Sequence, residues 1–312
     1  SRTLKMPGVM FLGGFMSDMT GTKATHLEEH CIRQGLGYTR FDYGGHGQSS
    51  GKFADGTIGQ WAADAIAVLD EITTGPQILV GSSMGGWIML LVALARPERV
   101  AGLVGIAAAP DFTEDLMWAQ FSEDQKKTIM EDGALIEPTD YGDDPYTITR
   151  NLIEDGRDQL VLRKPLEIKC PVRLVQGMKD PDVPWQTALR LTEALVTDDV
   201  RIDLIKTGDH RLSEPDQLDV ITKHFDEILA RRKDNPTAFA IAKCQARTTW
   251  LSSTLTATGS STSPVQGPET HSPSWMRNRA PWVEQMISSP KSLMNSSGSI
   301  SSGTPTCGQL FT

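Results

Sequence analysis

Short apolar runs alternate with amphipathic stretches from the start of the chain to about residue 232. Several runs lack polar alternation, which is typical of strands that are covered on both faces. We expect six strands, at Gly8–Gly13, Tyr38–Asp42, Gln77–Val80, Val100–Ala108, Val172–Gln176 and Arg201–Ile205.

The stretches between these strands have helical periodicity. We expect helices at Thr22–Gln34, from Thr57 onward, at Gly85–Arg96, from Trp185 to about Val196, and from Ser213 onward. In the second helix Thr57 and Gln60 form a potential capping box, and the apolar face comprises Ile58, Trp61, Ala65, Leu69 and Ile72. Strands that alternate with helices predict an α/β fold with a mostly parallel sheet and helices on both faces.

The alternation is interrupted over about residues 111–165, where Met117, Trp118 and Phe121 lie among many acidic residues. Ligand sites in open α/β sheets lie at the carboxyl ends of the strands. An insertion between two strands is therefore expected to form a small lid over those ends. An ordinary surface excursion is the alternative.

Composition changes beyond residue 232. The segment 248–312 is dense in Ser, Thr, Gly and Pro, and no helical or strand period persists there. We therefore divide the chain into a folded domain, 1–232, and a tail, 233–312, which we expect to be disordered or of non-native coding.

The formal net charge is −9, with 30 basic and 39 acidic residues. A general nucleic-acid binder would need a basic face, so this class of partner is not expected. The longest uninterrupted apolar segment, Trp87–Ala95, is far shorter than the roughly 20 residues of a membrane span. Oligomeric state stays open.

Four cysteines, Cys31, Cys170, Cys244 and Cys307, are scattered without a CxxC spacing or a neighbouring histidine pattern for zinc. We expect free thiols in a reducing compartment, and hence a cytoplasmic location. A disulfide between Cys244 and Cys307 is the alternative.

The segment from Gly81 to Gly85 carries the strongest chemical signal, a G-x-S-x-G pattern between a strand and a helix. Such a serine occupies a sharp turn, and the residues two before and two after it must be small. Ser83 meets this requirement with glycine on both sides. Ser82 would be flanked by Val80 and Met84, so Ser83 is the expected nucleophile.

An oxyanion would need backbone N–H donors beside this serine. The N–H of Met84, at the start of the following helix, is one candidate. The second is expected from the loop after the first strand, Gly13-Gly14-Phe15, through the N–H of Phe15. A plain turn is the alternative interpretation of that loop.

His210 is the expected general base, because it follows the last strand and comes after the serine and the acid in chain order. Asp180 is preferred over Asp182 as the acid that orients the imidazole. Asp209 is adjacent to His210 in sequence, which is poor geometry for that role.

The other histidines have plainer interpretations. His26 and His30 are spaced as i and i+4, which could bind a metal, but a solvated helix face is expected because no third ligand is evident. His46 lies in a glycine-rich loop, and we expect it to structure that loop, with contact to substrate as the alternative. No metal or organic cofactor is predicted, because a Ser-His-Asp triad needs none and no glycine loop matches a phosphate-binding motif.

Several segments resemble the α/β-hydrolase superfamily, and within it the mitochondrial palmitoyl-protein thioesterases that also cleave mycophenolic-acid acyl-glucuronide, with their bacterial relatives. The segments that carry the resemblance are Gly21–Ala24, Arg40–Tyr43, Gly75–Ser83, Ala95–Glu98, Gly177–Asp180 and Asp209–Arg211. The resemblance covers about residues 7–232. It implies the same Ser-His-Asp triad and carboxylester or thioester substrates.

We therefore expect a serine hydrolase that cleaves small-molecule esters or thioesters through an acyl-enzyme on Ser83. The alternatives are an acyltransferase with the same triad and a catalytically silent binding scaffold. Met16, Met117, Trp118 and Trp185 are candidate substrate-binding residues, and core packing is an equally good explanation for each.

Overall fold

The computed structural model describes residues 6–139 and 145–234. The main sheet contains the strands β1 (Gly8–Leu12), β2 (Tyr38–Arg40), β3 (Gln77–Ser82), β4 (Val100–Ile106), β7 (Val172–Gly177) and β8 (Val200–Ile205). Their order across the sheet is β2-β1-β3-β4-β7-β8, and every neighbouring pair is parallel. The six expected strands are confirmed, with ends that shift by a few residues.

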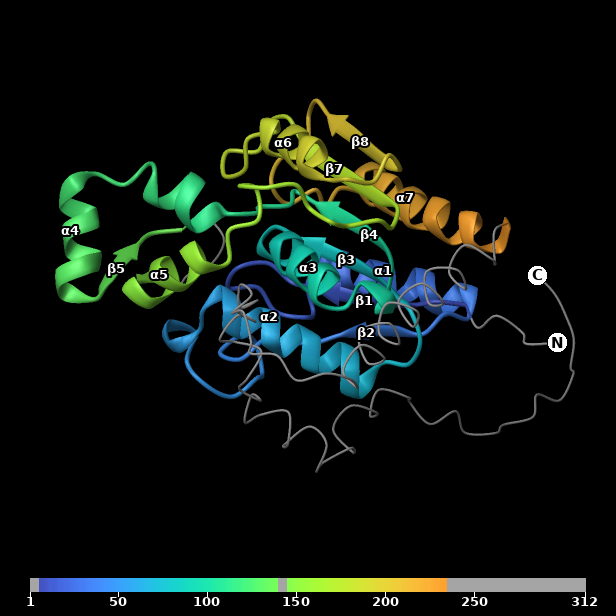
Figure 1. Ribbon diagram of the computed structural model, residues 1–312, viewed down its shortest axis with the longest axis horizontal. Helices are drawn as coiled ribbons and strands as arrows, with labels where there is room; N and C mark the ends of the chain where they lie inside the picture. The colour runs from blue at the N-terminus through green and yellow to red at the C-terminus, as the bar shows by residue number, and fades with distance from the viewer. Residues whose placement is uncertain (1–5, 140–144, 235–312) are drawn as a thin grey trace, which may run out of the picture.

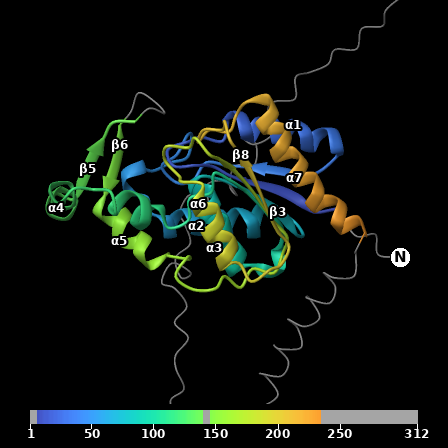
Figure 2. The same cartoon turned by 90° about the horizontal axis from the view of Figure 1, so that it is seen from above.

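Helices cover both faces of this sheet (Figures 1 and 2). On one face lie α1 (Thr22–Gln34) and α7 (Pro215–Asp234), and on the other lie α2 (Ile58–Ala67), α3 (Met84–Ala95) and α6 (Gln186–Ala194). Short helical turns, η1 (Phe53–Asp55), η2 (Val68–Ile72) and η3 (Pro97–Arg99), complete the connections. The predicted α/β architecture is confirmed.

Alternation along the strands divides the interior into two cores. In β1, Val9 and Phe11 pack with α1 and α7, whereas Met10 and Leu12 pack with α2 and α3. Side chains of a strand point alternately to the two faces, so a strand covered on both faces needs apolar residues at every position. This is why the strand sequences appear as unbroken apolar runs.

The start of α2 differs from the expected capping box. The Thr57 hydroxyl accepts the Gln60 N–H at 3.3 Å, but the Gln60 side chain donates to Asp64 at 3.0 Å instead of returning to the backbone of Thr57. Asp64 is fully buried, and its carboxylate accepts the hydrogen bond from the Gln60 side-chain amide. Ile72, expected on the apolar face, is 42% exposed because η2 widens the last turn into a π-helix.

His26 and His30 do not form the solvated helix face that the sequence predicted. His26 lies 3.1 Å from the Thr222 hydroxyl, and His30 Nε2 lies 2.9 Å from the Asp226 carboxylate. Both partners belong to α7. The two histidines therefore join the helices that share this face of the sheet.

The insertion after β4 forms a separate unit beside the sheet, visible at the left of both views (Figures 1 and 2). It comprises η4 (Thr113–Trp118), α4 (Glu123–Asp132), the antiparallel pair β5 (Ala134–Glu137) and β6 (Tyr146–Thr149), and α5 (Arg150–Asp158). Its apolar centre is Ile129, Ile148 and Ile153. This unit corresponds to the predicted insertion at about 111–165.

Asp111 holds together the two ends of this insertion. Its buried carboxylate accepts the N–H groups of Val161 and Leu162 at 2.7 and 2.9 Å and the Arg163 guanidinium at 3.2 Å. The chain therefore enters and leaves the insertion at one point. Burial raises the pKa of Asp111, and the donated hydrogen bonds oppose that shift.

Among the helices of the described residues, none has the length and apolar character to cross a bilayer. Helix α7 ends at Asp234, two residues into the segment 233–312 that the sequence assigned to the tail. The rest of that segment lies outside the described residues, as do Cys244 and Cys307. Cys31 and Cys170 are present as thiols. The expected cytoplasmic location stays a prediction.

Candidate active site

Ser83 occupies the sharp turn between β3 and α3, with a φ of 54° and a ψ of −119°. A non-glycine residue with a positive φ is strained, and such strain persists only where the surroundings impose it. The Ser83 N–H donates to the Ile106 carbonyl at 2.9 Å, and its own carbonyl accepts N–H groups from Gly86 and Ala109. These bonds fix the turn and leave the hydroxyl at the helix N-terminus.

The two flanking glycines are required by space. A methyl group on Gly81 would overlap the Gly85 carbonyl, and one on Gly85 would overlap the carbonyl oxygens of Leu12 and Gly13. The predicted need for small residues on both sides of Ser83 is therefore confirmed. The close approach also brings the loop after β1 against the serine.

His210 and Asp180 complete a chain of three side chains. The His210 Nε2 atom lies 3.0 Å from the Ser83 Oγ atom, and Nδ1 lies 2.8 Å from the Asp180 Oδ2 atom. The serine comes from β3–α3, the acid from the loop after β7, and the histidine from the loop after β8. The parallel sheet brings these three loops to one edge.

The Asp180 carboxylate is fully buried and well supplied with donors. Its Oδ1 atom accepts the N–H groups of Asp182 and Val183, each at 2.9 Å, and Oδ2 accepts the Gln176 amide at 3.0 Å. A buried carboxylate needs such donors in place of the water that it has lost. The turn therefore orients Asp180 toward His210.

The acid and histidine loops are joined through their backbones. Lys179 N–H donates to the Gly208 carbonyl and Met178 N–H donates to the Ile205 carbonyl, both at 2.9 Å. A methyl group on Gly177 would overlap the Gly208 carbonyl. Adjacent strands thus set the distance between the two catalytic candidates.

Asp209, unlike Asp180, binds the backbone of its own turn. Its Oδ1 atom accepts the N–H groups of Arg211 and Leu212, at 3.0 and 3.1 Å. It therefore closes the turn in which His210 stands, as a short polar residue commonly does.

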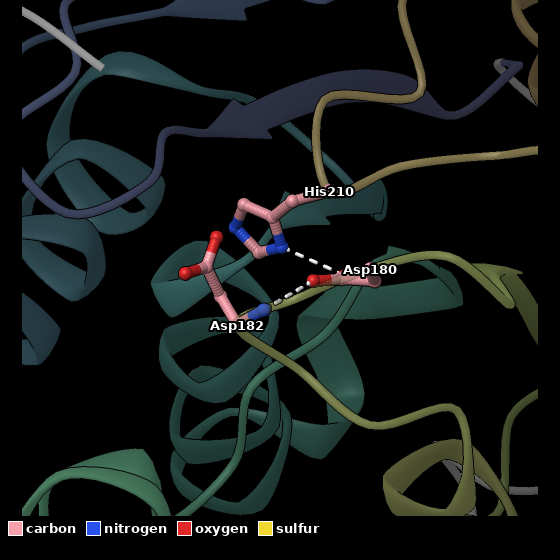
Figure 3. Close-up of side chains that lie close together, drawn as sticks. All are labelled: Asp180, Asp182 and His210. Carbon is pink, nitrogen blue, oxygen red and sulfur yellow. Dashed lines mark hydrogen bonds and ion pairs between the residues drawn. The ribbon is translucent and has the colours of Figure 1, made fainter. Parts of the chain in front are cut away.

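Asp182, the less favoured acid, lies beside His210 on the surface (Figure 3). Ligand atoms of Asp180, Asp182 and His210 all lie within 4.8 Å of one another, a spacing that a metal ion could use. A metal there would compete with the bond between His210 and Asp180. The absence of a metal or cofactor stays a prediction.

The oxyanion candidates lie on either side of the serine. Met84 is the first residue of α3, whose first N–H groups lack acceptors within the helix. Phe15 lies in the turn that Ser17 N–H closes on the Gly14 carbonyl. A methyl group on Gly14 would stand 3.4 Å from the Ser83 Cβ atom, so this turn adjoins the nucleophile.

The Phe15 ring forms a cluster that sequence reasoning did not foresee. It packs edge-on against four aromatic rings, at centroid distances of 4.8–6.0 Å: Phe53, Trp61, Phe112 and Tyr146. Tyr146 belongs to β6 of the insertion. The Phe15 ring therefore joins the loop beside Ser83 to the insertion.

His46 structures its loop, as the sequence predicted. It is 3% exposed and packs against Tyr43, Phe53 and Trp61. Burial lowers the pKa of His46. Its Nε2 atom has no hydrogen-bond partner among the described residues.

The four substrate-binding candidates are all half-buried. Met16 follows Phe15 with a φ of 53°, and Trp185 directly precedes α6. Met117 packs against the apolar centre of the insertion. The Trp118 ring lies under the Arg157 guanidinium at 4.6 Å and near the Lys126 ammonium at 5.8 Å, so packing within the insertion accounts for it.

Comparison with known proteins places this architecture in a family. A family model described as serine aminopeptidase, S33 matches residues 9–132. The mitochondrial palmitoyl-protein thioesterase ABHD10 of Mus musculus is 41% identical over 226 residues, which are 72% of this chain and 76% of that protein.

Two solved structures have the same fold as this chain. A hydrolase from Agrobacterium vitis S4 superimposes with a TM-score of 0.70 at 44% identity, covering 72% of this chain and 88% of that one. The mouse α/β hydrolase domain-containing protein 10 has a TM-score of 0.67 at 38% identity, covering 73% and 92%. The chain therefore belongs to the α/β-hydrolase family of esterase- and thioesterase-type serine hydrolases that includes ABHD10.

Proposed function

We propose that this hydrolase cleaves fatty-acyl thioesters, and the corresponding esters, through an acyl-enzyme on Ser83. The observation that carries the proposal is the continuous contact from Ser83 Oγ to His210 Nε2 and from His210 Nδ1 to Asp180. The thioester preference is supported by the ABHD10 relatives, which are named palmitoyl-protein thioesterases.

The first half-reaction uses the contact between serine and histidine. Ser83 Oγ attacks the carbonyl carbon while its proton passes to His210 Nε2. Asp180 accepts the opposite ring N–H, keeps the required tautomer and stabilises the imidazolium. The negative oxygen that develops is bound by the N–H groups of Met84 and Phe15.

The intermediate then collapses. The bond to the alcohol or thiol breaks, the leaving group takes the proton from His210, and the acyl group remains on Ser83. Water repeats the sequence in the second half-reaction, with His210 as the base, and releases the carboxylic acid. In each half-reaction His210 takes up one proton and gives it to the group that leaves, so it returns to its starting state.

A fluorophosphonate probe tests the nucleophile. The wild-type protein should be labelled at Ser83, and Ser83→Ala should not be labelled. Ser82→Ala is the matched control, because it removes the neighbouring hydroxyl and should preserve labelling. Labelling that persists in Ser83→Ala would contradict the assignment.

The substrate class is tested with matched acyl chains. Palmitoyl-thioesters, p-nitrophenyl esters of increasing chain length and acyl-glucuronides should be compared by kcat/KM. The proposal expects the largest value for a long-chain thioester. A clear preference for short esters would keep the triad but reject the proposed substrate. Product analysis with added alcohol separates hydrolysis from acyl transfer.

A further inference from the structure

Lys23 occupies an unfavourable position in α1. It is the second residue of the helix, where the partial positive charge of the N-terminus favours acidic side chains. The first turn of α1 contains no acid that would compensate. A residue that breaks a local preference in this way is expected to have a task elsewhere in the fold.

The contact that Lys23 makes is with the turn that carries His210. Its Nζ atom donates to the carbonyl of Arg211, the next residue after the histidine. The Asp209 carboxylate, which binds the same turn from within, attracts the ammonium. The groups that face Lys23 are thus the Arg211 carbonyl, the Asp209 carboxylate and the Arg211 guanidinium.

We propose that Lys23 is a positioning residue, whose ammonium holds the turn 209–211 and so keeps the His210 imidazole on the Ser83 hydroxyl. This inference rests on the proposed function. The turn leaves the sheet after β8 and is fixed on one side by the acid loop. Lys23 supplies the opposite attachment, from α1. Misplacement of a catalytic group by about 1 Å can lower a rate roughly 100-fold.

The charge of Lys23 gives the attachment a pH dependence. Desolvation lowers the pKa of Lys23 to about 8, the Arg211 guanidinium acts in the same direction, and Asp209 opposes them. Below that pH the ammonium binds the Arg211 carbonyl and attracts Asp209. Above it the attraction to Asp209 is lost, so activity should fall as the lysine deprotonates.

The charge of Lys23 affects folding stability in the opposite direction from its proposed effect on activity. A lysine whose pKa is lower in the folded state disfavours folding while it is charged, because the unfolded chain binds the proton more readily. Replacement by a neutral residue relieves this cost and removes the bond to the Arg211 carbonyl, so Lys23→Met should change Tm at neutral pH only slightly. A merely structural lysine predicts a lower Tm together with an unchanged pH profile of kcat, which separates the two roles.

The experiment compares Lys23→Met, Lys23→Arg and the exposed control Lys169→Met, which lies before β7 at the opposite end of the sheet. The fall in activity as Lys23 deprotonates is called the alkaline fall. With a p-nitrophenyl ester, Lys23→Met should lower kcat roughly 10- to 100-fold, with little change in KM and no alkaline fall. Lys23→Arg should keep activity at neutral pH and move the alkaline fall upward, because guanidinium stays protonated. Lys169→Met should match the wild type.

Three results would overturn the inference. The first is a Lys23→Met variant with wild-type kcat and alkaline fall. The second is a wild type without any fall near the lysine pKa. The third is a folded Lys23→Arg variant whose alkaline fall stays at the wild-type pH. This third result tests the role of Lys23 even if Lys23→Met fails to fold.

A second readout does not need catalysis. In Ser83→Ala, the NMR signal of the His210 ring should show an inflection near the pKa of Lys23. The inflection should disappear when Lys23→Met is added. A protein that cleaves no ester would reject the proposed function, while the NMR titration would still decide the role of Lys23.

Discussion

The Asp180 Oδ2 atom and the His210 Nδ1 atom lie 2.8 Å apart, although 30 residues separate them in the chain. One follows β7 and the other follows β8, and these strands are parallel neighbours at the edge of the sheet. The contact therefore depends on register in the sheet as well as on the two loops. It also favours Asp180 over Asp182 as the acid that orients the histidine.

Asp180→Asn should lower kcat by about 10³- to 10⁴-fold, because an amide in place of the carboxylate favours the wrong imidazole tautomer. Asp182→Asn is the matched control. The bond from Asp182 to Asp180 uses the backbone N–H, which the substitution preserves. Steady-state kinetics on one ester would measure both. Equal losses in the two variants would contradict the assignment of the acid.

Gly85→Ala should abolish both activity and stable folding, because its methyl group would overlap the Leu12 and Gly13 carbonyls. Gly37→Ala is the control, since a methyl group there meets nothing within 4 Å and its backbone needs no positive φ. Circular dichroism and fluorophosphonate labelling would report the two effects. A folded, labelled Gly85→Ala protein would show that the turn can relax.

Asp111→Ala should destabilise the fold by about 2–5 kcal/mol, because it leaves the N–H groups of Val161 and Leu162 without their acceptor. Urea unfolding followed by tryptophan fluorescence would measure the change.

The control for this substitution is Asp132→Ala, at the exposed end of α4 in the same insertion. An exposed residue without such bonds should change stability by less than about 0.5 kcal/mol. Similar values for the two variants would mean that water replaces the Asp111 acceptor.

Acidification should destabilise the protein as the pH falls below about 6.5, the ordinary pKa of histidine. Burial lowers the pKa of both His46 and His224 in the folded state. The unfolded chain therefore takes up these protons first, and stability is lost as pH falls.

His46→Phe should reduce that loss, because phenylalanine keeps the aromatic packing and cannot take up a proton. Part of the loss should remain through His224. The difference in Tm between pH 7 and pH 5 would be compared with the wild type. An unchanged difference would show that His46 contributes nothing to acid sensitivity.

Much of the fold was evident in the sequence. Apolar runs such as Gly8–Leu12 identify strands that are buried on both faces, because no solvent-facing position interrupts them. Ser83 was identifiable because its geometry depends on residues two positions away, Gly81 and Gly85. Such requirements are local, so a single sequence displays them directly.

The tertiary structure decided the relationships between distant segments. His26 and His30 face Thr222 and Asp226, and Lys23 reaches Arg211, across 188 or more residues of chain. Helix periodicity shows that a face is polar, but it does not show whether solvent or another helix covers it. That depends on packing over the whole sheet, which brings together side chains that have no local pattern in common.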